Sequence, residues 1–308
     1  MSNERFNMEM SKLEKRLEAQ FKKLDSKGKP IIVNGKQVSD RGAIQDILSH
    51  FKAFDISGKT ISIYTIKGGV SKTTLATNLA TALTMLGYKV LFIDTDPQSN
   101  GTSVFNVQHE YSINDLFNGI ADFEHTKCSY DTGYGILDII PSNIMLFNTA
   151  EDLHVREERF ILKKIIDEVK PMYDFVVVDC NPTINILAEN VMIASDYLIA
   201  PVQLEVFSID GYSNLIKKIE DMRIFNSQLD ILALVPVMYK SNWGLHNHIL
   251  NDLSSMGLPI ASTIRQAHEV PLSQYNRIPT MLSSKSYKIN VIKDFWLLAV
   301  DILTKLGL

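Results

Sequence analysis

A glycine-containing loop between two apolar segments most constrains the fold of this chain. The apolar run 61–65 precedes the loop at 66–74, and an amphipathic run at 75–83 follows it. This order predicts a strand, a tight loop and a helix. Such a loop presents backbone N–H groups and a helix N-terminus to an anion, and Lys72 adds a full positive charge. We therefore expect a phosphate-binding site built on an α/β framework.

The loop departs from the usual phosphate-binding pattern in a defined way. That pattern has glycines one residue and six residues before its lysine, where this chain has Ser71 and Ile66. An additional lysine, Lys67, stands ahead of the two glycines. A nucleotide polyphosphate is the natural ligand of such a loop, and the hydroxyl of Thr73 is placed to bind Mg²⁺.

Apolar runs alternate with helical segments from residue 60 onward. The predicted strands lie at 89–93, 138–140, 175–178, 197–200 and 231–237. Continuous apolar strands separated by helices indicate a parallel sheet that is covered on both faces. We therefore predict an α/β fold with a mostly parallel, twisted sheet flanked by helices. Phosphate ligands of such sheets bind beyond the carboxyl ends of the strands.

Carboxylates follow two of the predicted strands. Asp94 and Asp96 come directly after one strand, and Asp179 ends the apolar run 175–178. An acid that ends a buried strand is unfavourable unless it is paired or binds a metal. Asp179 is therefore the candidate Mg²⁺ partner. A carboxylate near a γ-phosphate, such as Asp96, can orient a water for in-line attack.

Four segments in order resemble the ParA/MinD family of P-loop ATPases. They are 67–74, 94–98, 173–182 and 201–211, and the resemblance covers about residues 58 to 308. It implies an ATPase with ATP and Mg²⁺ as cofactors and with slow intrinsic turnover. It also implies a homodimer in which ATP is sandwiched at the interface.

The resemblance assigns roles to individual residues. It implies that Lys67 reaches the partner subunit's nucleotide, that Asp96 positions the attacking water, and that Asp94 supports the metal shell or its loop. The implied catalytic residues are Asp96, Lys67 and Lys72. The implied metal ligands are Thr73, Asp179 and Asp94. The implied nucleotide-binding residues are Lys67, Gly68, Gly69, Val70, Ser71, Lys72, Thr73 and Thr74.

Two positions depart from the family pattern. The family has glycine where Ser71 stands and usually proline where Asn181 stands. Glycine avoids a Cβ beside the phosphates and permits a positive φ. Serine can still donate its N–H, so we expect nucleotide binding to be retained.

The resemblance further implies DNA and protein partners. The ATP dimer would bind DNA without sequence preference, and a ParB-like centromere-binding protein would trigger hydrolysis, so that a plasmid or chromosome is segregated. Because the formal net charge is −4, DNA affinity must come from a local basic patch. The candidate DNA contacts are Arg265, Lys285 and Lys288.

Two alternative functions stay open on the sequence. A MinD-like ATPase cycles on membranes or positions protein clusters, but Asp294 and Asp301 make the apolar C-terminal helix a poor binder of anionic lipid. We favour packing of that helix onto the sheet, and no membrane partner. A non-hydrolysing, nucleotide-dependent scaffold or regulator is the other alternative, and Ser71 and the N-terminal helices are its support.

The first 57 residues differ from the rest. Apolar residues at helical spacing predict a helix over 6–24, a turn at Asn34-Gly35 follows a short strand, and a second helix is expected at 44–51. We divide the chain into a helical extension at 1–57, for docking or packing, and an ATPase domain at 58–308. With no secretory signal and two isolated cysteines, Cys128 and Cys180, we expect a cytoplasmic protein, and the resemblance implies that it associates with the nucleoid.

Overall fold

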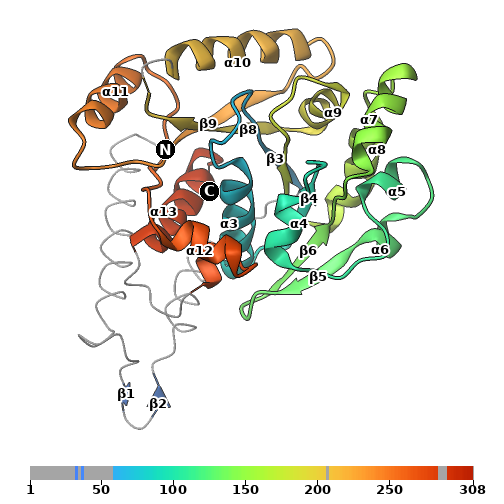
Figure 1. Cartoon of the computed structure of the whole chain (residues 1–308), viewed down its shortest axis with the longest axis horizontal. Coiled ribbons are helices and arrows are strands. Elements are labelled where there is room, and N and C mark those ends of the chain that lie inside the picture. Colours follow the sequence, from blue (N-terminus) through green and yellow to red (C-terminus); the bar gives the residue numbers. More distant parts are fainter. Residues whose placement is uncertain (1–31, 34–35, 38–57, 206–207, 284–289, 308) are drawn as a thin grey trace.

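A seven-stranded sheet forms the centre of the computed structural model, which describes residues 32–33, 36–37, 58–205, 208–283 and 290–307 (Figure 1). The strand order is β5-β6-β4-β7-β3-β8-β9, and only β5 is antiparallel to its neighbour. The strands are β3 (Lys59–Ile63), β4 (Val90–Asp94), β5 (Cys128–Asp131), β6 (Ile136–Ile140), β7 (Phe175–Asp179), β8 (Tyr197–Gln203) and β9 (Asp230–Val237). The predicted fold class is confirmed.

One strand of the sheet was not predicted. β5 lies at the edge of the sheet, where its residues alternate between half-buried and exposed positions. An edge strand of this kind has no continuous apolar run, so the criterion that detected the buried parallel strands could not detect it.

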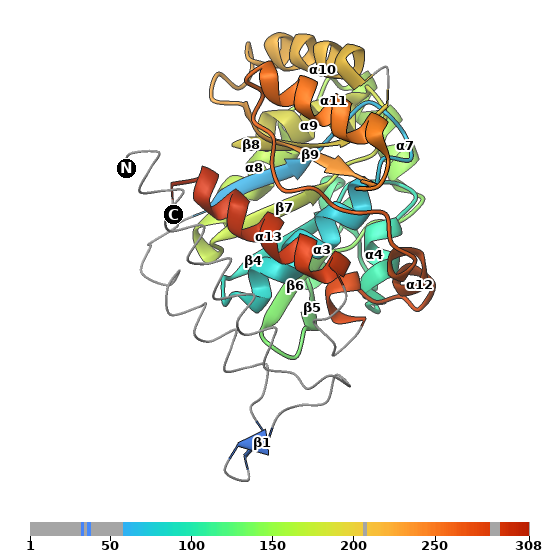
Figure 2. The ribbon, with the colours of Figure 1, turned by 90° about the vertical axis from the view of Figure 1, so that its left-hand side faces the viewer.

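Helices cover both faces of the sheet (Figures 1 and 2). On one face lie α3 (Lys72–Met85) and α13 (Asn290–Lys305), and the other face is covered by α7 (Leu146–Val155), α8 (Ile161–Val169), α9 (Ile186–Ala194) and α10 (Ser208–Met222). Successive strand residues point to opposite faces, so β4 places Phe92 in the core under α3 and places Leu91 and Ile93 in the other core.

The C-terminal helix packs on the sheet, as the sequence indicated. Phe295, Trp296 and Leu298 of α13 are at most 2 % exposed and belong to the core that α3 also lines. The acidic residues of this helix also form contacts, since Asp301 accepts a hydrogen bond from the backbone N–H of Ser262 at 2.8 Å. The apolar face of α13 is therefore used inside the fold.

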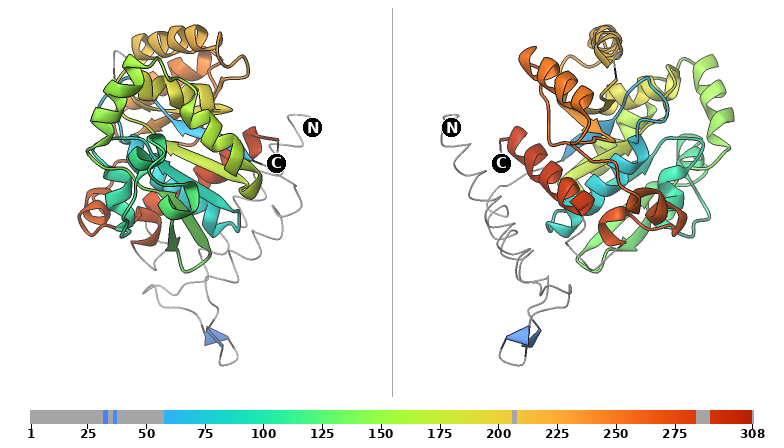
Figure 3. Two further views of the ribbon diagram at one scale, coloured as in Figure 1. Left: turned by 90° about the vertical axis from the view of Figure 1, so that its right-hand side faces the viewer. Right: turned by 60° about the vertical axis from the view of Figure 1, so that its left-hand side comes forward.

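Short helices connect the main elements of the fold (Figure 3). They are α4 (Asn100–Phe105), α5 (Ile113–Phe117), α6 (Phe123–Thr126), α11 (Gly244–Ser255), α12 (Glu269–Tyr275) and the 3₁₀ turns Lys170–Met172 and Thr280–Leu282. None of the helices within the described ranges is long and apolar enough to cross a membrane.

The N-terminal segment is described only at two short strands. β1 (Ile32–Val33) and β2 (Lys36–Gln37) pair antiparallel, and the Asn-Gly turn expected between them lies outside the described residues. The helices predicted at 6–24 and 44–51 lie outside the described residues, so the helical extension stays a prediction.

Candidate functional site

The phosphate loop leaves the sheet at its carboxyl edge, between two neighbouring strands. β3 lies between β7 and β8, and the loop then turns into α3 at Ser71. Ser71 has φ 62° and ψ 28°, which is the left-handed region. A non-glycine residue in that region costs about 1–2 kcal/mol. The loop therefore has the backbone shape that a glycine would adopt freely, although a serine occupies the position.

Lys72 lies over the loop. Its Nζ donates a hydrogen bond to the carbonyl of Lys67 at 2.9 Å, and the residue is 7 % exposed. Burial lowers the pKa of Lys72, while the negative charges of Asp179 and Asp96 raise it. The ammonium group is thus placed beside two carboxylates, where the attraction favours its charged form.

Asp179 is buried beneath the loop at the end of β7, and burial, followed by the charge of Asp94, raises its pKa well above the ordinary value. Within the described part of the chain, neither of its carboxylate oxygens has a hydrogen-bond partner. The nearby Thr73 hydroxyl, which does not reach hydrogen-bond geometry, and then the charge of Lys72 oppose that rise in pKa. A buried carboxylate without partners fits a cation ligand.

The described residues contain no group of three His, Cys, Asp or Glu side chains that could hold a metal ion. A cation next to Asp179 and Thr73 would therefore take most of its ligands from water and a bound phosphate. Mg²⁺ is usually held in this way, by one or two protein oxygens together with substrate phosphates. The residues present therefore fit Mg²⁺ bound together with a nucleotide.

Asp94 is fully buried and supports the loop that follows β4. Its Oδ2 accepts hydrogen bonds from the backbone N–H and the hydroxyl of Thr102, both at 2.8 Å, and its Oδ1 accepts from the N–H of Asp96 at 3.0 Å. Burial raises the pKa of Asp94 to about 6, and these hydrogen bonds oppose that rise. Asp94 thus connects α4 to the segment that carries Asp96.

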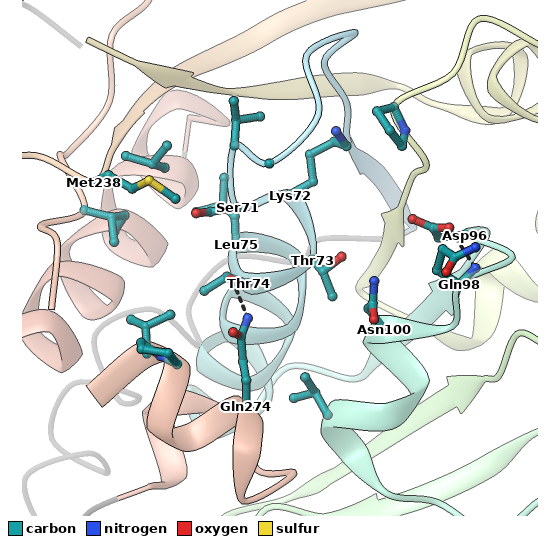
Figure 4. Close-up of a pocket in the computed structure, with 18 of the residues that line it drawn as sticks. Ser71, Lys72, Thr73, Thr74, Leu75, Asp96, Gln98, Asn100, Met238 and Gln274 are labelled. Carbon is teal, nitrogen blue, oxygen red and sulfur yellow. Dashed lines mark hydrogen bonds between the residues drawn. The ribbon is translucent and has the colours of Figure 1, made fainter. Parts of the chain in front are cut away.

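Asp96 lies on the wall of the main cavity (Figure 4). Its Oδ1 accepts a hydrogen bond from the N–H of Gln98 at 2.9 Å, and its carbonyl accepts one from the hydroxyl of Ser142 at 2.8 Å. The turn and the neighbouring strand end therefore fix this carboxylate on the cavity wall, and its role in orienting water stays a prediction.

The cavity beside the loop has a volume of about 1090 Å³ and two unlike walls. Loop residues, Asp96 and the segment 181–183 form the polar wall. The other wall is mainly apolar and includes Val237, Met238, Ile264, Val270 and Pro271. Ligand pockets of 300–1,000 Å³ commonly combine an apolar lining with a few polar groups, so the space suits a nucleotide with its base on the apolar wall.

The apolar wall was missed by the sequence analysis. It is formed by the end of β9 and the segment 264–274, which are distant from the loop in sequence. One contact connects it to the loop, because Gln274 Nε2 donates to the Thr74 hydroxyl at 2.9 Å (Figure 4). No local motif marks these residues, and only the packing of α12 beside α3 brings them together.

Known proteins share this arrangement over most of the chain. A family model described as an AAA domain matches residues 58–231. The chromosome-partitioning ATPase Soj of Treponema pallidum is 31 % identical over 231 residues, which are 71 % of this chain and 90 % of that relative. The chain belongs to the ParA/MinD family of ATPases.

Another relative and two solved structures are also similar to this chain over most of its length. The sporulation initiation inhibitor protein Soj of Bacillus subtilis is 31 % identical over 201 residues, 64 % of this chain and 79 % of the relative. A Borrelia burgdorferi plasmid partition protein bound to AMPPNP has a TM-score of 0.68 and 27 % identity, covering 81 % of this chain and 98 % of its own. A cobyrinic acid a,c-diamide synthase from Mycobacterium smegmatis, with ADP and magnesium, has a TM-score of 0.64 and 25 % identity over 71 % of this chain and 92 % of its own.

The lysine that marks the ParA/MinD family lies at the surface. The Lys67 side chain is 54 % exposed, and its Nζ lies 2.5 Å from Glu205 Oε2. It is therefore at the rim of the site, in contact with a residue of the same subunit.

Only one of the three predicted DNA contacts, Arg265, lies among the described residues. Arg265 forms a two-point pair with Asp294, with Nε–Oδ2 at 2.6 Å and Nη2–Oδ1 at 2.7 Å, and it lines the nucleotide-sized cavity. Lys285 and Lys288 lie outside the described residues. The DNA role of all three residues stays a prediction.

Proposed function

We propose that this chain is a partition ATPase that dimerises around two ATP molecules, binds DNA without sequence preference in that state, and hydrolyses ATP when a ParB-like partner completes the site. One observation carries the proposal. The buried Asp179 carboxylate, which lacks hydrogen-bond partners among the described residues, lies beneath a phosphate loop whose cavity Asp96 also lines.

The residues of one subunit have different roles in phosphoryl transfer. The loop N–H groups and Lys72 bind the phosphates, while Thr73 and Asp179 hold Mg²⁺, which neutralises phosphate charge when it is bound. Asp96 accepts a hydrogen bond from the attacking water and orients it. Asp94 acts through the loop, because the contacts with Thr102 and Asp96 hold that water-orienting carboxylate in place.

The second subunit supplies the missing charge. In our proposal Lys67 reaches the partner's nucleotide, so that each site is complete only in the dimer. Phosphoryl transfer depends mainly on positioning and charge neutralisation. We therefore expect slow intrinsic turnover, because one charged group comes from the other subunit and the site is complete only when the activating partner binds.

The cargo is proposed from the relatives. Relatives of this chain include chromosome-partitioning ATPases, and one structural neighbour is a plasmid partition protein. We therefore place the protein on the nucleoid, in the cytoplasm. The burial of the apolar face of α13 supports this choice over a membrane-cycling ATPase, which would need that face free.

Titration calorimetry tests the core of the proposal. We expect ATP to bind in the presence of Mg²⁺, and we expect Asp179→Asn to remove the part of the affinity that depends on Mg²⁺. Turnover should then rise when DNA and a ParB-like protein are added together. The absence of binding at millimolar ATP would refute the ATPase assignment, whereas binding without stimulated turnover would favour a nucleotide-dependent scaffold.

A further inference from the structure

The buried amide of Asn181 has no role in the function proposed above. The residue lines the same cavity as Lys72, Thr73 and Asp96, and it is 5 % exposed. Its side chain forms no hydrogen bond with the part of the chain that the structure describes. A buried amide without a partner is unfavourable, and a polar ligand in the cavity would supply that partner.

The strand order places Asn181 between the phosphate loop and the segment that carries Asp96. β7 lies between β4 and β3, so the chain that leaves β7 emerges between the chains that leave those two strands. Asp94 and Asp179 are opposite each other in the register of β4 and β7. Asp96 and Asn181 each follow their member of this pair by two positions.

The two segments also stay together beyond the ends of their strands. The backbone N–H and the hydroxyl of Thr95 both donate to the carbonyl of Asp179, at 2.9 Å and 2.7 Å. Asp96 and Asn181 come directly after these connected positions on their two segments. The amide is therefore a neighbour of the carboxylate that we expect to orient the attacking water.

The amide differs chemically from the acids beside it. Ionised Asp96 and Asp179 can only accept hydrogen bonds, whereas an asparagine amide can donate two. A terminal phosphate held by Lys72 would lie near both carboxylates, which repel it. A neutral donor attracts a phosphate oxygen without bringing a second positive charge that the carboxylates would bind instead. Hydrogen bonds to a charged acceptor are also stronger than those between neutral groups.

We propose that the Asn181 amide donates a hydrogen bond to the terminal phosphate of the bound nucleotide, so that the site prefers a nucleoside triphosphate to a diphosphate. The inference rests on the proposed function, in which the phosphate loop binds ATP. A diphosphate does not reach the amide and leaves it unpaired again. Asn181 thereby favours the exchange of the product ADP for ATP after each hydrolysis.

Titration calorimetry of the full chain with Mg²⁺ and either AMPPNP or ADP measures this preference. We expect Asn181→Ala to weaken AMPPNP binding by about ten- to hundredfold, the range for a hydrogen bond to a charged group. The affinity for ADP should stay within about twofold of the wild type, because the diphosphate never makes the contact. Asn181→Leu keeps a branched side chain without donors and should show the same selective loss.

Urea unfolding without nucleotide separates a ligand-binding amide from a structural one. Asn181→Ala should not lower the urea midpoint, because no hydrogen bond within the described residues is lost. Asn190 is the matched control, since it is 0 % exposed but its amide donates to the carbonyls of Glu158 and Ile186, both at 2.9 Å. Asn190→Ala should lower the midpoint and leave the ratio of AMPPNP to ADP affinity unchanged.

The contrary results are distinct. Equal losses of AMPPNP and ADP affinity in the Asn181 variants would assign the amide to another part of the nucleotide or to the shape of the loop, and unchanged affinities would give it no contact at all. Either result overturns the inference and leaves the proposed function standing. A wild type that binds neither nucleotide would remove the ATP site, and the inference with it.

Discussion

The serine at position 71 shows how one residue can depart from a motif while the backbone keeps its shape. Its left-handed φ of 62° is the conformation for which the family uses glycine. The adjoining helix α3 still begins at Lys72, and the backbone N–H of Leu75 donates a hydrogen bond to the Ser71 carbonyl at 2.9 Å. The departure therefore changes local strain and adds a Cβ, and it leaves the loop geometry in place.

Replacing Ser71 with glycine should relieve that strain. We expect Ser71→Gly to raise the free energy of unfolding by about 0.5–1 kcal/mol, as measured by urea unfolding. This gain is the energetic cost of the left-handed conformation minus the cost of the greater freedom that glycine has in the unfolded chain. Ser71→Ala, which also lacks the hydroxyl but stays strained, should show no gain. A loss of ATP affinity in both variants would show that the hydroxyl contacts phosphate.

The buried carboxylates predict a dependence of stability on pH. The pKa values of Asp94 and Asp179 are raised, chiefly by burial, and Asp94 reaches about 6. Between the unfolded pKa of about 4 and these folded values, the folded protein binds more protons than the unfolded chain. The free energy of unfolding therefore falls as the pH rises through this window.

Asp179→Asn removes one of the two carboxylates and should reduce that fall. With EDTA and no nucleotide, we expect the variant to gain about 1–3 kcal/mol relative to the wild type between pH 4 and pH 7, as measured by urea unfolding. Mg²⁺ and ATP should reverse the order, because the wild type binds them more tightly and therefore gains more stability from them. Parallel pH profiles of the two proteins would contradict the prediction.

At the scale of elements, α4 lies so close to β4 that only glycine fits at one position. A Cβ on Gly101 would lie 2.8 Å from the ring of Phe92 and 3.1 Å from Asp94 Oδ2. Thr102 of the same helix donates its hydrogen bonds to Asp94. The packing of α4 on β4 therefore determines where the segment with Asp96 lies.

Gly101→Ala should therefore disturb both stability and turnover. We expect a loss of about 1–3 kcal/mol in the free energy of unfolding, because the ring and the carboxylate have to move, together with slower ATP hydrolysis. Gly244 at the start of α11 has nothing within 4 Å of the corresponding position, so Gly244→Ala is the matched control. Equal effects of the two substitutions would show that the close packing does not matter.

The pair between Arg265 and Asp294 connects the segment that lines the cavity to α13. Asp294 is 5 % exposed, so Arg265→Ala would leave a buried carboxylate unpaired. We expect this substitution to lower the free energy of unfolding by about 1–3 kcal/mol. This loss is below the range for fully buried pairs, because the Arg265 side chain is 43 % exposed. Arg265→Met with Asp294→Leu should recover most of it in urea unfolding.

The same variants separate folding from DNA binding, as measured by gel shift at two salt concentrations. If Arg265 contacts DNA phosphates, the double variant binds DNA more weakly although it is stable. If the residue is purely structural, the double variant binds DNA like the wild type.

At the scale of the whole molecule, a shared site predicts complementation between two inactive chains. Lys67→Ala and Asp96→Ala should each lose ATP turnover. In a mixed dimer, the site on the Lys67→Ala subunit keeps its own Asp96 and receives Lys67 from its partner. Equal mixing should therefore restore about a quarter of wild-type turnover, because half the dimers are mixed and one of their two sites is complete.

The measurement is steady-state phosphate release with DNA and the activating partner present. If Lys67 served its own subunit, the mixed dimers would contain no complete site, and turnover would stay at the level of the separate variants. That result would contradict the action of Lys67 in trans while leaving the roles of Lys72 and Asp179 intact.

The sequence by itself determined the parallel sheet, the phosphate loop and the carboxylates at the strand ends. Each of these follows from a local sequence pattern, since a buried strand is a continuous apolar run and the acidic residues follow such a run directly. The tertiary structure alone decided the edge strand β5, the apolar wall of the cavity, and the partners of Lys67 and Arg265. These features depend on contacts between segments that are far apart in the chain. Local residue spacing does not indicate which distant strand end or helix will pack against a given segment.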